Sequence, residues 1–179
     1  MDVSGERFEV PLRQAACELA RLGAEGGGLD GGFQLVLAES CTGGLIAASL
    51  TGVPGASKWF CGSSVVYQEA SKFSWLNISE KLIDQYSAES PETTAAMSRA
   101  ILDVTPHATL SLATTGHLEP DSQRARSEPH VFVSIASREG GTIEFGHAVE
   151  MPLMGESRLD RQRQAAAIAI HALIDFLRN

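Results

Sequence analysis

The sequence contains no uninterrupted apolar run close to the roughly 20 residues that a helix needs to cross a bilayer. Positive charge is also scarce, because 14 lysine and arginine residues stand against 22 acidic residues, for a formal net charge of −8. Wide contact with nucleic acid needs a clustered positive surface, so a nucleic-acid partner is disfavoured. The first ten residues are polar and acidic, so no signal peptide is predicted and a cytoplasmic protein is expected.

Residues that form disulfides or bind metals are sparse as well. The three cysteines, Cys17, Cys41 and Cys61, form no CxxC pair, and such an odd set favours a reducing compartment over a disulfide framework. Cys17 falls on the apolar face of a predicted helix and is expected in the core. The five histidines show neither HxxxH nor HxH spacing, so no metal and no other cofactor is predicted.

The composition that is present predicts one compact domain. Apolar residues make up 44% and charged residues 20% of the 179 residues, as in ordinary globular proteins. We expect a single domain over residues 1–179, with residues 1–10 as an N-terminal tail. Strands alternate with helices, so the predicted fold class is α/β, a three-layer mixed β-sheet flanked by helices.

Hydrophobic periodicity and turn signals place the individual elements. Residues 115–129 are expected to be irregular, and the last two strands to form a hairpin. The helix that begins at Ser90-Pro91-Glu92 is expected to bury one stripe, consisting of Met97, Ala100, Ile101 and Val104. Helices are predicted over residues 12–22, 45–50, 72–76, 80–85, 91–104 and 159–177, and strands over 33–38, 63–67, 108–114, 131–135 and 143–147.

The segment Ala38-Glu39-Ser40-Cys41-Thr42-Gly43-Gly44 stands where a predicted strand meets a predicted helix. Open α/β sheets bind ligands at such places. Free N–H groups at a helix N-terminus attract anions, and paired glycines allow close approach. Two interpretations are open: Ser40 is a nucleophile, or it simply caps a helix after a tight turn.

A second segment, Val65 to Lys72, carries one of only three lysines in the chain. A lysine among apolar neighbours can act as a base, because burial lowers its pKa toward neutrality. The alternative interpretation of Lys72 is a solvated residue on the surface of a helix.

Together these segments resemble the CinA C-terminal domain family. The family pattern is AESCTGG, then a tyrosine about 27 residues later and a lysine five positions beyond it. Here Ser40 and Tyr67 are 27 residues apart, and Lys72 follows five positions later. The resemblance covers nearly the whole chain, and it continues through Leu50-Thr51-Gly52-Val53-Pro54-Gly55-Ala56-Ser57, Gly62-Ser63-Ser64-Val65-Val66-Tyr67, and Ser90-Pro91-Glu92-Thr93 with Met97.

The resemblance implies a nicotinamide-nucleotide amidase. Such enzymes hydrolyse the carboxamide of nicotinamide mononucleotide to nicotinate mononucleotide and ammonia without a metal. Carried over by position, Ser40 is the nucleophile, Lys72 is its base, and Tyr67 relays the proton or orients the base. Backbone N–H groups that stabilise the oxyanion or hold the nucleotide are expected near Thr42, Gly43 and Gly44.

The family site also includes an arginine near the start of the last helix, in a GDRxxxR pattern. This chain has Gly155-Glu156-Ser157-Arg158-Leu159-Asp160-Arg161-Gln162-Arg163. Arg158 is the predicted partner of a substrate phosphate or carboxylate. An inserted residue and a shifted second arginine leave Arg161 and Arg163 open, and all three can instead solvate the helix start.

The chain departs from the family in the loop that normally reads TGIAGPxGG. Here the sequence is Thr115-Gly116-His117-Leu118-Glu119-Pro120-Asp121-Ser122-Gln123. Thr115 and Gly116 are retained and are predicted to contact substrate. The added side chains can close the pocket, and a carboxylate at Glu119 would disfavour an anionic nucleotide if it faces the site.

Two functions are therefore open. In the first, the chain is an amidohydrolase that acts on a small-molecule nucleotide substrate, either the family's own or an altered one. In the second, it is a catalytically silent ligand-binding, regulatory or assembly module. An open pocket with Ser40 close to Lys72 favours the first, and a pocket filled by His117, Leu118 or Arg124 favours the second. The resemblance further implies a homo-oligomer, and the stand-alone form without the N-terminal pyrophosphatase-like domain of full-length CinA proteins.

Overall fold

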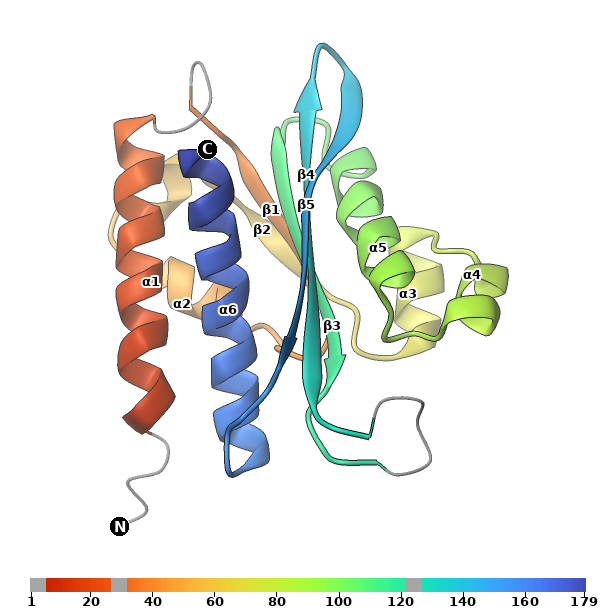
Figure 1. Ribbon diagram of the computed structural model, residues 1–179. Helices are drawn as coiled ribbons and strands as arrows, with labels where there is room; N and C mark the ends of the chain where they lie inside the picture. The colour runs from red at the N-terminus through yellow and green to blue at the C-terminus, as the bar shows by residue number, and fades with distance from the viewer. Residues whose placement is uncertain (1–5, 27–31, 122–126) are drawn as a thin grey trace.

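The computed structural model describes residues 6–26, 32–121 and 127–179 as one α/β fold (Figure 1). The helices are α1 (Glu6–Glu25), α2 (Leu45–Thr51), the short 3₁₀ helix η1 (Ala56–Lys58), α3 (Glu69–Leu76), α4 (Glu80–Tyr86), α5 (Pro91–Asp103) and α6 (Arg158–Arg178). The strands are β1 (Leu35–Glu39), β2 (Phe60–Val65), β3 (Leu110–His117), β4 (His130–Glu139) and β5 (Thr142–Pro152).

The strands form one mixed sheet in the order β2-β1-β3-β4-β5. β1 pairs in parallel with both β2 and β3, whereas β3–β4 and β4–β5 are antiparallel. The carboxyl ends of the three parallel strands therefore meet at one edge of the sheet, where α/β proteins bind ligands. Ser40 follows β1 directly, and His117 ends β3.

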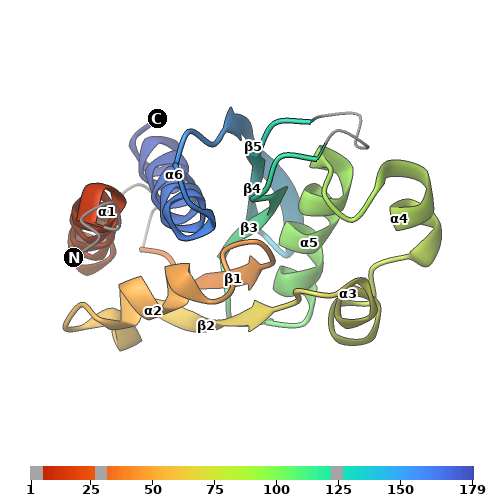
Figure 2. The same cartoon turned by 90° about the horizontal axis from the view of Figure 1, so that it is seen from below.

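Helices cover both faces of this sheet, as Figure 2 shows from below. α1, α2 and α6 lie on one face, and α3, α4 and α5 lie on the other (Figures 1 and 2). Side chains cap two helix starts, and the cap at Ser90 follows the predicted start signal. The Ser90 hydroxyl accepts the Thr93 N–H at the start of α5, and Ser157 and Asp160 form a capping box at the start of α6. The three-layer mixed sheet that the sequence predicts is confirmed.

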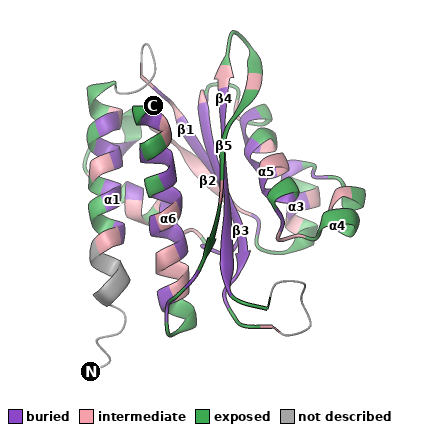
Figure 3. Ribbon diagram, in the orientation of Figure 1, coloured by how far each residue is buried: buried purple, intermediate pink, exposed green. Residues whose placement is uncertain are grey.

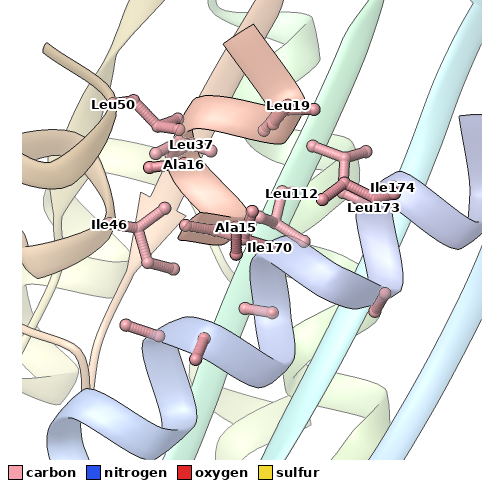
Figure 4. Close-up of a cluster of buried hydrophobic side chains, with 14 of the residues drawn as sticks. Ala15, Ala16, Leu19, Leu37, Ile46, Leu50, Leu112, Ile170, Leu173 and Ile174 are labelled. Atoms are coloured by element: carbon pink, nitrogen blue, oxygen red, sulfur yellow. The ribbon is translucent and has the colours of Figure 1, made fainter. Parts of the chain in front are cut away.

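A separate apolar core lies on each side of the sheet. The larger one joins α1, α2 and α6 to the sheet, and Figure 4 shows Leu19, Ile46 and Ile170 converging with Leu37 and Leu112 of the central strands. β1 and β3 are buried over their whole length, whereas β5 is exposed along much of its length (Figure 3). The buried central strands thus form the edge at which Ser40 lies.

Four expectations about local structure need correction. Cys17 is exposed, because at 100° per residue it lies off the stripe formed by its neighbours Ala16 and Leu19. Val104 is 56% exposed, because α5 ends before it. The expected tail is shorter than ten residues, since α1 already begins at Glu6.

The expected irregular stretch also starts later than predicted. Thr115, Gly116 and His117 belong to β3, because they pair with Phe132, Val131 and His130 of β4. In the described parts of the chain, no helix has the length and apolar character that crossing a membrane requires.

Candidate active site

Ser40 is held in a tight turn between β1 and α2. Its backbone N–H donates to the Thr114 carbonyl at 3.1 Å, and its own carbonyl accepts the Gly43 N–H at 3.0 Å. Gly43 and Gly44 have φ values of 63° and 91°, a region that glycine adopts without steric cost. The turn places the Ser40 side chain at the wall of a cavity while leaving the residue only 5% exposed.

The buried carboxylate of Glu39 anchors this turn. The residue is fully buried, and one carboxylate oxygen accepts the Thr42 hydroxyl at 2.8 Å, the Gly44 N–H at 3.0 Å and the Ile46 N–H at 3.2 Å. The other oxygen accepts the Ala47 N–H at 3.0 Å and the Ser63 hydroxyl at 3.1 Å. Glu39 therefore supplies the acceptors that the first turn of α2 lacks. No local sequence pattern predicts this role of Glu39.

Lys72 projects from α3 toward Ser40 and is 1% exposed. Its Nζ lies 3.1 Å from Ser40 Oγ, 2.9 Å from the Val66 carbonyl and 3.5 Å from the Tyr67 carbonyl. Burial lowers the pKa of Lys72 below its ordinary value, and the nearby charge of Glu69 acts in the opposite direction. The alternative of a solvated surface lysine is therefore wrong.

The contacts of Lys72 fit both its ammonium form and the neutral amine that a base requires. Such an amine has two N–H groups and one lone pair. The ammonium donates to Ser40 Oγ and to the carbonyls of Val66 and Tyr67. In the neutral amine, the two carbonyls can accept both N–H groups, and the lone pair then faces the Ser40 hydroxyl. The pair is thus arranged for proton transfer from Ser40 to Lys72.

Cys41, next to Ser40, also lines the cavity, but its thiol is poorly suited to nucleophilic attack. Burial raises the pKa of its thiol to about 12. The thiol is therefore protonated at neutral pH, and the thiolate is the reactive form of cysteine.

The side chain of Tyr67 faces Arg158 at the cavity mouth. Arg158 Nη2 donates to the Tyr67 hydroxyl at 2.8 Å, and Arg158 Nη1 lies 3.8 Å from a carboxylate oxygen of Glu119. Tyr67 thus contacts Lys72 through its backbone carbonyl and Arg158 through its phenol. This arrangement fits an orienting role better than a proton relay.

The cavity between these groups has a volume of about 330 Å³. It extends from the end of β1 across the end of β3 to the start of α6. Its polar lining suits a small hydrophilic ligand. The lining residues are Ser40, Cys41, Tyr67, Glu89, Gly116, His117, Leu118, Glu119, Pro120, Asp121 and Arg158.

Of the six residues predicted to contact substrate, the cavity lining includes Gly116 and Arg158. The N–H groups of Gly43 and Gly44 already donate to Ser40 O and to Glu39, so they are not free to stabilise an oxyanion. The hydroxyl of Thr42 donates to Glu39 and that of Thr115 pairs with Thr94, and both threonines are fully buried. The structure thus gives these four residues roles within the fold.

The three candidate arginines differ in what they contact. Arg158 faces the cavity. Arg161 instead binds the backbone carbonyls of Gly155 and Leu118, each at 2.8 Å, and so ties the loop after β3 to the start of α6. Arg163 lies beside a different cavity, between α1 and α2. Arg158 is therefore the arginine that can meet a ligand at this site.

The altered loop lines the cavity without filling it. His117 is 7% exposed, and its Nε2 atom has no hydrogen-bond partner among the described residues. Burial lowers the pKa of its imidazole, so the ring is neutral at pH 7. Position 116 accepts no residue with a side chain without a shift of the backbone, because a Cβ atom on Gly116 would stand 2.2 Å from the His130 carbonyl oxygen. Arg124 lies outside the described residues.

Sequence reasoning missed two acidic residues of the lining, Glu89 and Asp121. Glu89 lies between α4 and α5 and is 49 positions from Ser40 in the sequence, so no local pattern connects the two. Asp121 lies in the loop between β3 and β4. Among the residues described, no group of three or more histidine, cysteine or acidic side chains is placed to hold a metal ion.

The fold and the site define an α/β protein with a buried serine–lysine pair at the carboxyl edge of its parallel strands. The sequence model of the CinA C-terminal domain family matches residues 28–177. A CinA-like protein of Syntrophomonas wolfei is 32% identical over 148 residues, which cover 83% of this chain and 34% of that protein. A putative competence-damage inducible protein of Halalkalibacterium halodurans is 32% identical over 132 residues, 74% of this chain and 30% of that protein.

The chain belongs to the CinA C-terminal domain family. It spans about a third of the length of the two curated relatives. A crystal structure of a competence-damaged protein (CinA) superfamily protein from Escherichia coli covers 99% of both chains, with a TM-score of 0.78 and 22% identity. A superfamily protein from Klebsiella pneumoniae gives 0.77 at 25% identity, over 93% of this chain and 97% of that one.

Proposed function

We propose that the protein is a serine–lysine amidohydrolase that converts a carboxamide into a carboxylic acid and ammonia. The observation that carries the proposal is the 3.1 Å contact between Ser40 Oγ and the buried amine of Lys72, at the wall of an open cavity. An unactivated hydroxyl does not attack an amide at neutral pH, so such an enzyme needs a base placed in this way.

The proposed reaction has two halves. Lys72 takes the proton of the Ser40 hydroxyl as Oγ bonds to the carboxamide carbon, and it returns that proton to the nitrogen as the C–N bond breaks and ammonia leaves. Water then attacks the acyl ester and gives up a proton to Lys72. Lys72 passes that proton to Ser40 Oγ as the C–Oγ bond breaks, which releases the carboxylic acid and restores Ser40. The ammonium of Lys72 beside Oγ would also stabilise the negative intermediate.

Nicotinamide mononucleotide is the reference substrate for this proposal, because the family resemblance implies it. Its product would be nicotinate mononucleotide. In this scheme Arg158, oriented by Tyr67, meets the part of the substrate remote from the carboxamide. The neutral imidazole of His117 supplies a further polar contact inside the cavity.

Ammonia release tests the proposal. We expect the purified protein to release ammonia from nicotinamide mononucleotide or from its unphosphorylated riboside, and the Ser40→Ala variant to release none. The variant removes only one hydroxyl, so a contaminating amidase would remain active in its preparation. If the folded wild-type protein releases no ammonia from either compound, the amidase proposal is wrong. The catalytically silent binding module then becomes the better interpretation.

The pH dependence of the reaction should report on Lys72. Because the base must be neutral, we expect kcat/KM to rise with pH through the lowered pKa of Lys72 and then level off. Initial rates measured from about pH 6 to about pH 10 would show this limb. A rate that falls over the same range would mean that the required form of Lys72 is the charged one, contrary to its assigned role.

A further inference from the structure

One ion pair at the cavity mouth has no part in the amide chemistry. Glu119 lies between two arginines, 3.8 Å from Arg158 and 3.2 Å from Arg161. Both Glu119 and Arg158 line the cavity, and each side chain is 53% exposed. A ligand that enters therefore meets a carboxylate next to the guanidinium that would otherwise bind its anionic end.

Arg161 fixes the position of Glu119. The side chain of Arg161 is only 13% exposed, and it binds the carbonyl of Leu118 as well as the Glu119 carboxylate. It also holds the Gly155 carbonyl at the start of α6. These contacts hold the segment that carries Glu119 in place. An anion that enters would therefore compete with the Glu119 carboxylate for Arg158 and would not displace the loop.

We propose that Glu119 is a specificity-determining residue, which selects carboxamides whose remote part is uncharged over those that carry a phosphate. The inference rests on the proposed amidase only for the carboxamide end of the ligand. A phosphate that approaches Arg158 is attracted less strongly, because the charge of Arg158 is already partly balanced by Glu119. The Glu119 carboxylate also repels the phosphate directly. The neutral ring of His117 brings no positive charge to offset that repulsion.

Two ligands that differ by one phosphate isolate this effect, namely nicotinamide riboside and nicotinamide mononucleotide. Their dissociation constants are measured by calorimetry in a Ser40→Ala background, so that neither is consumed. We expect the riboside to bind more tightly than the mononucleotide. Glu119→Gln keeps the shape of the side chain and should tighten mononucleotide binding by about three- to tenfold, with little change for the riboside.

Glu144→Gln is the matched control, because it changes the net charge equally at the other end of the sheet. Glu144 lies on β5 opposite Ser137, which pairs with Leu110 at the start of β3. This control should leave both dissociation constants unchanged. The effect of Glu119→Gln should also shrink in high salt, because both side chains at the mouth are half exposed.

The inference is overturned if the Ser40→Ala protein binds the mononucleotide as tightly as the riboside or more so. It is also overturned if neither ligand binds, or if Glu119→Gln and Glu144→Gln shift the mononucleotide equally. Ammonia assays with Ser40 intact keep the two proposals apart. A binding preference without ammonia release would contradict the amidase but support the selection by Glu119.

Discussion

Replacing Lys72 with methionine is expected to abolish ammonia release, with a loss in kcat of about 10³-fold or more. Methionine has a similar length and no basic nitrogen, so Ser40 would keep its place but lose the atom that accepts its proton. Ammonia release over hours, at enzyme concentrations comparable to that of the substrate, would measure the residual rate. The loss should exceed that from any change at Arg158, which we propose to meet only the remote part of the ligand.

The stability of this variant separates a chemical role from a structural one. Removing the amine of Lys72 removes the free-energy cost of burying it away from water. It also leaves the carbonyls of Val66 and Tyr67 without their hydrogen-bond donor. These terms oppose each other, so we expect the free energy of unfolding to change by about 2 kcal/mol or less. Lys81→Met, on the exposed side of α4, should retain full activity. A Lys72→Met protein that stays active would exclude Lys72 as the base.

The sequence predicts most of the architecture because its local signals agree with the global fold. A capping serine locates α5, paired glycines locate the turn after β1, and an apolar stripe locates α6, and the observed elements follow these signals. Errors arise at element ends, where tertiary pairing decides. His117 continues β3 because it faces His130 across the sheet, and nothing in its local sequence specifies that pairing.

The site was only partly predictable for a related reason. A serine after a strand and a lysine 32 positions later suggest chemistry, but only the fold brings the two side chains into contact. The three arginines near the start of α6 look equivalent in sequence. Their roles differ because the helix turns Arg158 toward the cavity and Arg161 toward the backbone of the loop after β3. The packing of the helix decides which of its residues face the cavity. The spacing of the arginines in the sequence does not reveal that packing.

The role of Glu39 also depends on contacts that the sequence does not reveal, and its substitution should have the second large effect, on stability. We expect Glu39→Gln to lower the free energy of unfolding by about 3 kcal/mol or more. The carboxylate accepts hydrogen bonds on both oxygens, from five donors in all. Glutamine offers one oxygen, and its amide nitrogen would face donors such as the Ala47 N–H or the Ser63 hydroxyl. The substitution therefore leaves buried donors unpaired inside a fully enclosed site.

Urea unfolding at neutral pH would measure this loss. Glu92→Gln is the matched control, because Glu92 is an exposed acid in the first turn of α5 and should cost about 0.5 kcal/mol or less. The same Glu39 variant should also lose activity below its unfolding transition, since the turn that holds Ser40 depends on the Gly44 and Thr42 contacts. If Glu39→Gln proves as stable as Glu92→Gln, the carboxylate does not hold this turn, and the position of Ser40 must depend on the β1–β3 pairing instead.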